Sequence, residues 1–315
     1  MTMTSRLRLW IYLAPILLMP VAIFSVAVLV VPTDWLGFRS NSEYILTSGW
    51  GAELHNADCS ILLYGDSTAL VGLNPILIQK RTGLTACNIA EIEGMSAVNG
   101  TMVLDQYLAH NPKPQVLLIQ FAPENFDPSR QRDNPDITKF EAIRYLLRQP
   151  NKLESLLQLS RRPEELMKWS EQGTRMIVSA IRSKPFPPAT RFIRYSTQGQ
   201  LSWPDPSATG CFYPSHAYPP DRAWVQELRS KYASQGIKVI VVAMQLPDCD
   251  PDLQYYRHEL AGVIDNNPIK TLPPNVYYVE DGVSRHVNKT GSALLSEAAA
   301  DQILNHLQAA ATQKP

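Results

Sequence analysis

The chain has 315 residues, of which 45% are hydrophobic and 18% charged, enough for the core of one large domain or two small ones. Lys+Arg and Asp+Glu number 29 each, and the resulting zero net charge gives no support to a nucleic acid partner. The 25 prolines indicate long ordered loops and argue against a compact helical bundle. We therefore expect a globular protein with a sizeable core and no nucleic acid partner.

The N-terminal segment predicts attachment to a membrane. Residues 9–31 carry no charge and are long enough to span a bilayer as a single helix. Arg6 and Arg8 precede them, and the positive-inside rule then keeps the N-terminus in the cytoplasm. The alternative is a cleaved signal peptide, for which residues 25–27 offer a small-x-small cleavage site, but the length of the apolar run favours an uncleaved anchor. We expect a single-pass protein of a bacterial inner membrane whose main domain lies in the periplasm or outside the cell.

The remaining elements alternate between strands and helices. Residues 1–31 form the cytoplasmic tip and the anchor, and residues 32–58 are typical of a polar stalk. The pattern then predicts strands at 60–64, 86–92, 114–123, 236–247 and 275–281, and helices at 67–81, 95–110, 221–235 and 290–308. Strands that alternate with helices predict a parallel sheet with right-handed crossovers. The expected fold class is α/β, a three-layer α/β/α sandwich.

One insert interrupts this alternation. Residues 127–220 are far longer than an ordinary connection, with two or three helices over 138–183 and a loop rich in proline and aromatic residues after them. Residues 139–194 hold 12 Lys and Arg against 5 Glu and no Asp, a net charge of +7. This bias indicates either a solvated helical face or a cap that contacts an anionic glycan or lipid headgroups.

The cysteines suit an exported domain. Four are present, an even number of the kind expected in an oxidising compartment: Cys59, Cys87, Cys211 and Cys249. None belongs to a Cys-x-x-Cys pair, so we expect no zinc site, and we predict no other metal or cofactor. Four cysteines allow three pairings, and their spacing alone does not choose among them.

A serine stands where the first predicted strand stops and the first helix starts. Ser67 follows Gly65 and Asp66, and it is either the N-cap of the helix or a nucleophile whose surroundings favour developing negative charge. A nucleophile needs a base at the same edge of the sheet. Among six histidines, His286 lies in a loop between the last predicted strand and the last helix. Because ligand sites of open α/β sheets form at the carboxyl ends of the strands, we expect Ser67 and His286 to lie at one edge.

With these residues the chain resembles the SGNH (GDSL-type) hydrolases over residues 59–126 and 222–308. In that family the nucleophilic serine belongs to a Gly-Asp-Ser block after the first strand, here residues 65–67. A glycine follows the second strand, an asparagine follows the third, and the catalytic histidine precedes the final helix. The matching positions are Gly94, Asn125 and His286.

The resemblance implies an oxyanion hole and leaves the third catalytic member open. Its donors would be the backbone N–H groups of Ser67 and Gly94 and the side chain of Asn125. The family places its aspartate three residues before the histidine, but position 283 is Val, and Asp281 is a nearby alternative. Either a bulged loop brings Asp281 to His286, where it would orient the imidazole, or a Ser–His dyad works alone.

The resemblance also suggests the disulfides. The first two strands of such sheets are neighbours, and Cys59 and Cys87 each stand near the start of one of them. We therefore predict the pair Cys59–Cys87, within bridging range, and the pair Cys211–Cys249, which would tie the insert to the chain after the fourth strand.

A single anchor followed by such a domain resembles the envelope proteins that acylate polysaccharides, including the alginate O-acetylation proteins and the D-alanyl transfer protein of teichoic acid synthesis. This implies transfer of an acyl group, expected to be acetyl, to an extracytoplasmic polysaccharide or glycan, with a multi-span membrane acyltransferase as partner. The alternatives are a membrane-tethered esterase or deacetylase and a non-catalytic glycan-binding scaffold. Five aromatic residues would either stack on sugar rings or pack in the core: Trp203, Phe212, Tyr213, Tyr218 and Trp224.

Overall fold

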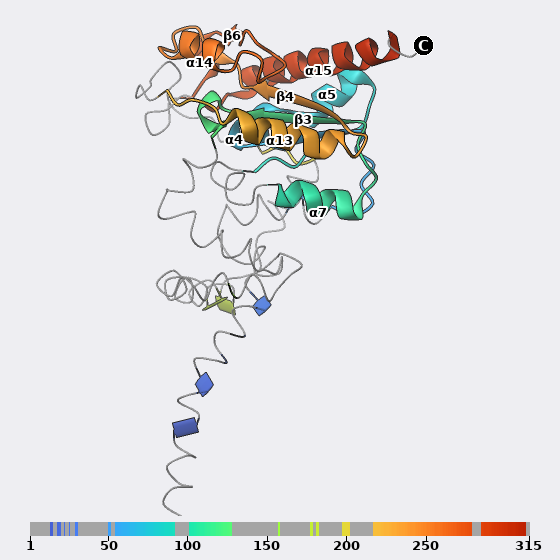
Figure 1. Cartoon of the computed structure of the whole chain (residues 1–315), viewed down its shortest axis with the longest axis vertical. Helices are drawn as coiled ribbons and strands as arrows, with labels where there is room; N and C mark the ends of the chain where they lie inside the picture. Colours follow the sequence, from blue (N-terminus) through green and yellow to red (C-terminus); the bar gives the residue numbers. More distant parts are fainter. Residues whose placement is uncertain are drawn as a thin grey trace, which may run out of the picture. The chain divides into compact units, whose positions relative to one another are not determined.

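The computed structural model describes residues 50–51, 54–91, 101–127, 197–201, 217–278 and 285–312, together with scattered positions between 13 and 182. Contacts between Cα atoms divide the chain into two units. The first comprises residues 1–42 and 139–186, and the second comprises residues 43–138 and 187–315. Nearly all of the described residues belong to the second unit, an α/β domain (Figure 1).

Four parallel strands form the main sheet, in the order β2-β1-β3-β4. Their bounds are Ile61–Gly65 for β1, Ala86–Asn88 for β2, Val116–Phe121 for β3 and Lys238–Ala243 for β4. The first residue of β1, Ile61, pairs with Ala86 of β2 on one side and with Val116 of β3 on the other. Because the strands are parallel and start in register, their carboxyl ends lie at one edge of the sheet. The predicted α/β class and parallel sheet are confirmed.

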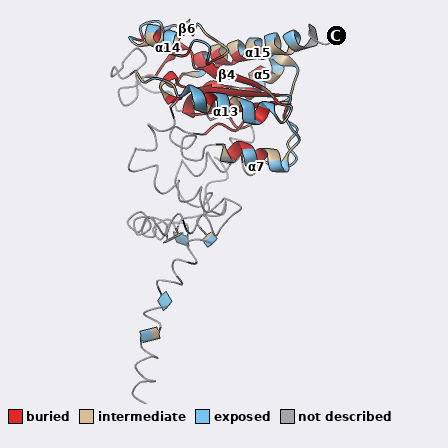
Figure 2. Ribbon diagram, in the orientation of Figure 1, coloured by how far each residue is buried: buried red, intermediate tan, exposed pale blue. Residues whose placement is uncertain are grey.

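Helices bury both faces of this sheet, which explains why the strands are continuous apolar runs rather than alternating ones. One face, which includes Ile61 and Val116, packs against the helices α4 (Ser67–Gly72), α5 (Pro75–Thr82) and α15 (Lys289–Thr312). The helix α13 (Arg222–Ala233) packs against β4, and its Trp224 ring contacts Phe121, which belongs to the other face. The helix α7 (Met102–His110) also turns buried residues inward (Figure 2).

The single helix predicted at residues 67–81 is two helices. The side chain of Asn74 accepts hydrogen bonds from the backbone N–H groups of Ile76 and Leu77 and so caps α5. Pro75 then occupies the first turn, where its missing N–H is not needed. A new N-cap followed by proline stops α4 after six residues and starts α5 in a new direction.

The last predicted strand, residues 275–281, is described only as far as Tyr278, and its first two residues lie in a turn. Residues Pro274–Val276 form a 3-10 turn, η2, and Tyr277 makes only an isolated antiparallel bridge with Val287. The N–H groups of Val276 and Tyr277 donate within this turn, to the carbonyls of Pro273 and Pro274. A separate small sheet pairs β5 (Leu246–Pro247) with β6 (Thr271–Leu272), and the helix α14 (Leu253–Glu259) lies between them in the chain.

The segment predicted as a stalk is packed on the domain in its second half. Trp50 is 4% exposed, and its Nε1 donates to the carbonyl oxygen of Asn88 at 3.1 Å. The side chain of Asn111 donates to the carbonyl of Leu54 and accepts from the N–H of Ala57. Residues 50–51 and 54–57 thus belong to the α/β unit, because a buried indole and paired backbone groups hold them there.

The predicted anchor and most of the insert lie outside the described residues. Within the described part of the chain, no helix combines the length and the apolar character that a membrane span needs. Of the insert, residues 197–201 pack on the domain, where the side chain of Gln200 donates to Val71 O at 2.8 Å and to Ser292 Oγ at 2.9 Å. The basic segment 139–194 is described at only a few positions.

The disulfide Cys59–Cys87 is present, which confirms that prediction. Cys59 stands just before β1 and Cys87 lies within β2, next to it in the sheet, so their Cα atoms are 5.7 Å apart. Cys249 is also disulfide-bonded. Cys211 lies outside the described residues, so the pair Cys211–Cys249 stays a prediction.

Candidate active site

Ser67 and His286 meet at the carboxyl edge of the sheet. The Nε2 atom of His286 lies 2.9 Å from the hydroxyl oxygen of Ser67, although 219 residues separate them in the chain. Ser67 is the first residue of α4, directly after β1, and is 4% exposed. His286 stands three residues before α15 begins. When the imidazole carries its proton on Nδ1, Ser67 donates a hydrogen bond to Nε2, the arrangement of a nucleophile and its base.

Gly65 allows β1 to turn into α4 at this place. Its φ of 150° is a conformation that side chains disfavour. A Cβ atom there would also collide with the backbone carbonyl of Gln120 on the neighbouring strand. Glycine is therefore required where the chain leaves the sheet toward Ser67.

Asp66, not Ser67, is the N-cap of α4, so the capping interpretation of Ser67 is wrong. One carboxylate oxygen of Asp66 accepts from the N–H and the hydroxyl of Thr68, at 2.9 and 2.6 Å. The other accepts from the N–H of Ala122 at 2.8 Å and from the side-chain amide of Asn125 at 2.7 Å. Burial raises the pKa of Asp66, and these hydrogen bonds oppose the rise. Through these hydrogen bonds Asp66 holds the turn at Ser67 against the chain that follows β3.

Asn125 ends a 3-10 turn, η1 (Pro123–Asn125), that follows β3, and it is buried. Its bond to Asp66 fixes the orientation of its amide beside the Ser67 turn. The backbone N–H of Ser67 has no acceptor among the described residues. The structure thus brings two of the three predicted oxyanion donors, Ser67 and Asn125, to one place, while Gly94 lies outside the described residues.

The chain around His286 is anchored through its backbone on both sides. The N–H of Tyr278 donates to the carbonyl of His286, and the N–H of Asn288 donates to the carbonyl of Val276, each at 2.9 Å. These bonds flank the bridge between Tyr277 and Val287. The backbone that carries the imidazole is therefore fixed against η2.

A buried ion-pair network adjoins the loops that carry Asn125 and His286. Arg285 Nε donates to Glu124 Oε1 at 2.6 Å, and Arg285 Nη1 donates to Asp250 Oδ2 at 2.8 Å. The three side chains are 11%, 14% and 0% exposed. Burial raises the pKa of Asp250, and the charge of Arg285 opposes this. Arg285 precedes His286 and Glu124 precedes Asn125, so the network ties the loop that carries His286 to the turn that carries Asn125.

Sequence reasoning missed this network. Nothing in the local pattern marks Arg285 as a partner of acids that lie 35 and 161 residues away. Asp281 lies outside the described residues, as do three of the five aromatic candidates. Trp224 packs on Phe121 with ring centroids 5.5 Å apart, so its role is in packing.

Searches against protein-family models, curated proteins and solved structures found no match for this chain. Among the described residues, no group of three or more His, Cys, Asp and Glu side chains is arranged to hold a metal ion. The chemistry of the site therefore has to be inferred from its own side chains.

Proposed function

We propose that the protein is a serine acyltransferase with an SGNH-like three-layer α/β/α sandwich. It moves an acyl group, expected to be acetyl, to a hydroxyl of an extracytoplasmic polysaccharide through an ester on Ser67. The observation that carries this proposal is the 2.9 Å contact between Ser67 Oγ and His286 Nε2 at the carboxyl edge of a parallel sheet. Asn125 and the Ser67 amide beside it suit the stabilisation of an oxyanion.

In the first half-reaction, Ser67 attacks the carbonyl carbon of the acyl donor while His286 Nε2 takes the hydroxyl proton. The carbonyl oxygen becomes an oxyanion, toward which the Ser67 N–H and the Asn125 side chain donate. The tetrahedral intermediate then collapses, the bond to the donor's leaving group breaks, and His286 returns the proton to that group. The product is an acyl ester on Ser67.

In the second half-reaction, His286 takes the proton of an acceptor hydroxyl, whose oxygen attacks the ester carbonyl. The bond to Ser67 Oγ breaks and the serine recovers its proton from the imidazole. Water in place of the sugar hydroxyl would give hydrolysis by the same steps. The acceptor that reaches the acyl ester therefore decides between transfer and hydrolysis.

We further propose that the domain is held at a membrane and receives its acyl group from a multi-span membrane partner. Among the described helical residues of the predicted anchor, four large apolar side chains are exposed, as suits contact with lipid: Leu13, Leu18, Met19 and Leu29. With the N-terminus cytoplasmic, the acceptor would be a periplasmic or cell-surface glycan.

The third member of the catalytic group is left to experiment. In a triad, Asp281 would fix the tautomer of His286 and stabilise the imidazolium. In a dyad, Asp281→Asn would leave the acylation rate nearly unchanged, whereas loss of a working triad member lowers it by about 10⁴.

The test is labelling of the full-length protein, in detergent, with a serine-reactive fluorophosphonate. We expect wild type to be labelled at Ser67, and Ser67→Ala and His286→Ala to lose labelling while keeping their circular dichroism spectra. Ser234→Ala, at the exposed end of α13, is the matched control and should label like wild type. Equal labelling of wild type and Ser67→Ala would refute the catalytic proposal. The non-catalytic glycan-binding scaffold would then be the favoured interpretation. An aryl acetate with an oligosaccharide acceptor then separates transfer from an esterase, which would release acetate only.

A further inference from the structure

The helix that carries Ser67 is too short to hold its own position. The helix α4 has six residues, and an isolated helix shorter than about 12 residues is marginal in water. The last carbonyl groups of an α-helix have no partner within it, and every residue of α4 is buried. The partners of these carbonyl groups therefore come from other parts of the fold, and they decide where the helix lies.

Two of these carbonyl groups are bound by a short stretch of the insert, residues 197–201, which we call the strap. The side chain of Gln200 donates to Val71 O at 2.8 Å. The backbone N–H of Leu201 donates to Leu70 O at 3.2 Å. The strap thus satisfies two consecutive acceptors at the end of α4 that the helix itself leaves open.

Gln200 also reaches the helix α15. Its Nε2 atom donates to Ser292 Oγ, in the first turn of that helix, at 2.9 Å. An amide nitrogen carries two N–H groups, so one side chain can bind both acceptors. Gln200 is 6% exposed, which shields both hydrogen bonds from water. This side chain therefore joins the helix that begins with Ser67 to the helix that follows His286.

The strap is itself fixed at the edge of the sheet. The N–H of Asn88, at the end of β2, donates to Gln198 O at 2.9 Å. Gly199 has a φ of 103°, and a Cβ atom there would collide with the carbonyl of Asn88 and the indole of Trp50. Glycine allows the strap to lie directly on β2. Gln200 is therefore presented to α4 and α15 by a backbone that is held in place.

We propose that Gln200 is a positioning residue for the acyl transfer proposed above. It acts through α4 and α15, and the bridge between these helices keeps Ser67 Oγ within hydrogen-bond distance of His286 Nε2. This inference rests on the proposed role of Ser67 and gives the end of the insert a part in it. A misplacement of reacting groups by about 1 Å can lower a rate about 10²-fold.

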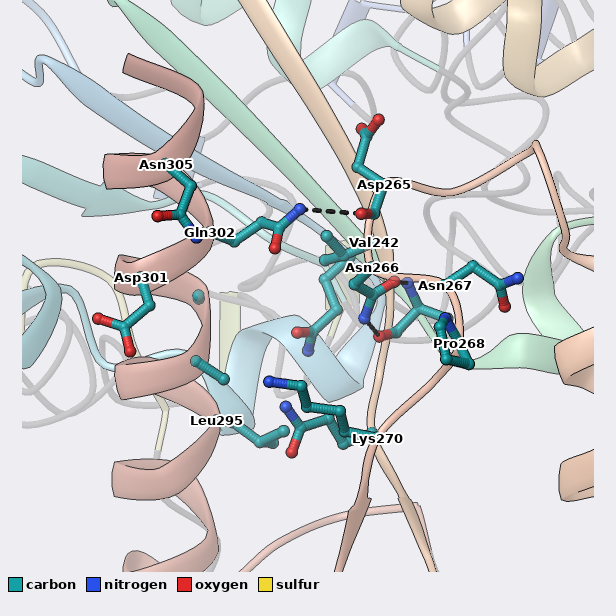
Figure 3. Close-up of a pocket in the computed structure, with 15 residues that line it drawn as sticks. Val242, Asp265, Asn266, Asn267, Pro268, Lys270, Leu295, Asp301, Gln302 and Asn305 are labelled. Atoms are coloured by element: carbon teal, nitrogen blue, oxygen red, sulfur yellow. Dashed lines mark hydrogen bonds between the residues drawn. The ribbon is translucent and has the colours of Figure 1, made fainter. Parts of the chain in front are cut away.

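The test compares Gln200→Met with a matched variant, each as the full-length protein in detergent. Gln200→Met has a similar volume and removes both donated hydrogen bonds. The control is Gln302→Met, the same change on α15. The side chain of Gln302 donates to Asp265 O at 2.9 Å, beside a cavity that both residues line (Figure 3). That bond ties α15 to the domain as well, but it does not involve α4.

Fluorophosphonate labelling of Ser67 at increasing reagent concentration separates the maximal rate from the concentration that gives half of it. We expect Gln200→Met to lower the maximal rate by about 10- to 10²-fold. The half-saturating concentration should stay unchanged, because misalignment of the reacting groups affects the chemical step and not the binding of the reagent. Gln302→Met should keep both wild-type values. Circular dichroism at the assay temperature checks that each variant is folded.

Ser292→Ala keeps the test decisive if Gln200→Met fails to fold. It removes only the α15 end of the bridge and should also slow the maximal labelling rate, although by less. Added to Gln200→Met, it should change the rate little further, because both changes break the same bridge.

Hydrogen–deuterium exchange of the α4 amides gives a readout that does not depend on the chemistry of Ser67. Exchange there should be faster in Gln200→Met and Ser292→Ala, but not in Gln302→Met. If wild type is not labelled, the proposed function fails, and exchange in α4 alone decides whether the strap holds that helix. The inference is overturned if Gln200→Met and Ser292→Ala label like wild type, if Gln302→Met slows labelling equally, or if exchange in α4 is the same in all three variants.

Discussion

Replacing Arg285 by Gln tests whether the buried network positions the loops that carry Asn125 and His286. In the wild type, the guanidinium lies 2.6 Å from Glu124 and 2.8 Å from Asp250, all three side chains being at most 14% exposed. Removing one member of a buried ion pair costs about 3 to 5 kcal/mol, because it leaves uncompensated charge in a poorly solvated place. Arg285→Gln would leave two carboxylates close together, so we expect it to lower the free energy of unfolding by an amount within that range.

The loss should depend on pH. Burial already raises the pKa of Asp250, with Arg285 opposing, so the arginine-free variant should hold a still higher pKa there. A folded state with the higher pKa binds more protons than the unfolded chain, and its stability rises as pH falls. Arg285→Gln should therefore be more destabilised at about pH 8 than at about pH 5. Adding Asp250→Asn to Arg285→Gln should restore part of the lost stability.

Urea unfolding of the full-length protein, followed by circular dichroism, measures the effect, and fluorophosphonate labelling of Ser67 reports on the site. Arg81→Gln is the matched control, because its pair with Asp301 is 59% and 54% exposed. Such an exposed pair contributes at most about 1 kcal/mol. Under native conditions, Arg285→Gln should also label more slowly than Arg81→Gln. Equal unfolding midpoints for the two variants at both pH values would refute the positioning role.

Three other outcomes follow from the structure. Asn125→Ala should slow fluorophosphonate labelling by about 10² to 10³, the usual effect of losing one oxyanion donor, and an unchanged rate would remove it from that role. Replacing both Cys59 and Cys87 by Ser opens a link across 28 residues and should lower the unfolding free energy by about 3 to 4 kcal/mol, measured in urea. Burial raises the pKa of Tyr107 from 10.0 to about 12, so stability present below pH 10.0 should be lost as pH rises toward 12. Tyr107→Phe should lessen that alkaline loss in thermal melts.

The strands and the positions of Ser67 and His286 at loop ends were predictable because their signals are local. Apolar runs such as 61–64 and 116–121 can be buried on both sides only between helices, and this identified the parallel sheet. A glycine before Asp66 and Ser67 marked the turn out of β1, and the loop before the last helix marked His286. Local patterns also misled: residues 275 and 276, predicted to begin a fifth strand, lie in the turn η2, and Asn74 with Pro75 divided a helix that periodicity alone joined.

Polar pairing was decided by tertiary structure alone. The sequence contains 29 acidic and 29 basic residues, and nothing in it says which of them meet. Only the packing of separate loops against one sheet edge brings Ser67 to His286 and Arg285 to its two acids. Asp66 illustrates the difference, since its position beside Ser67 is read from the sequence, but its bond to Asn125 exists because β1 and β3 lie side by side. Hydrophobic burial is non-directional and shows as a pattern along the chain, whereas a hydrogen bond or ion pair needs two particular atoms within about 3 Å, which only the folded chain provides.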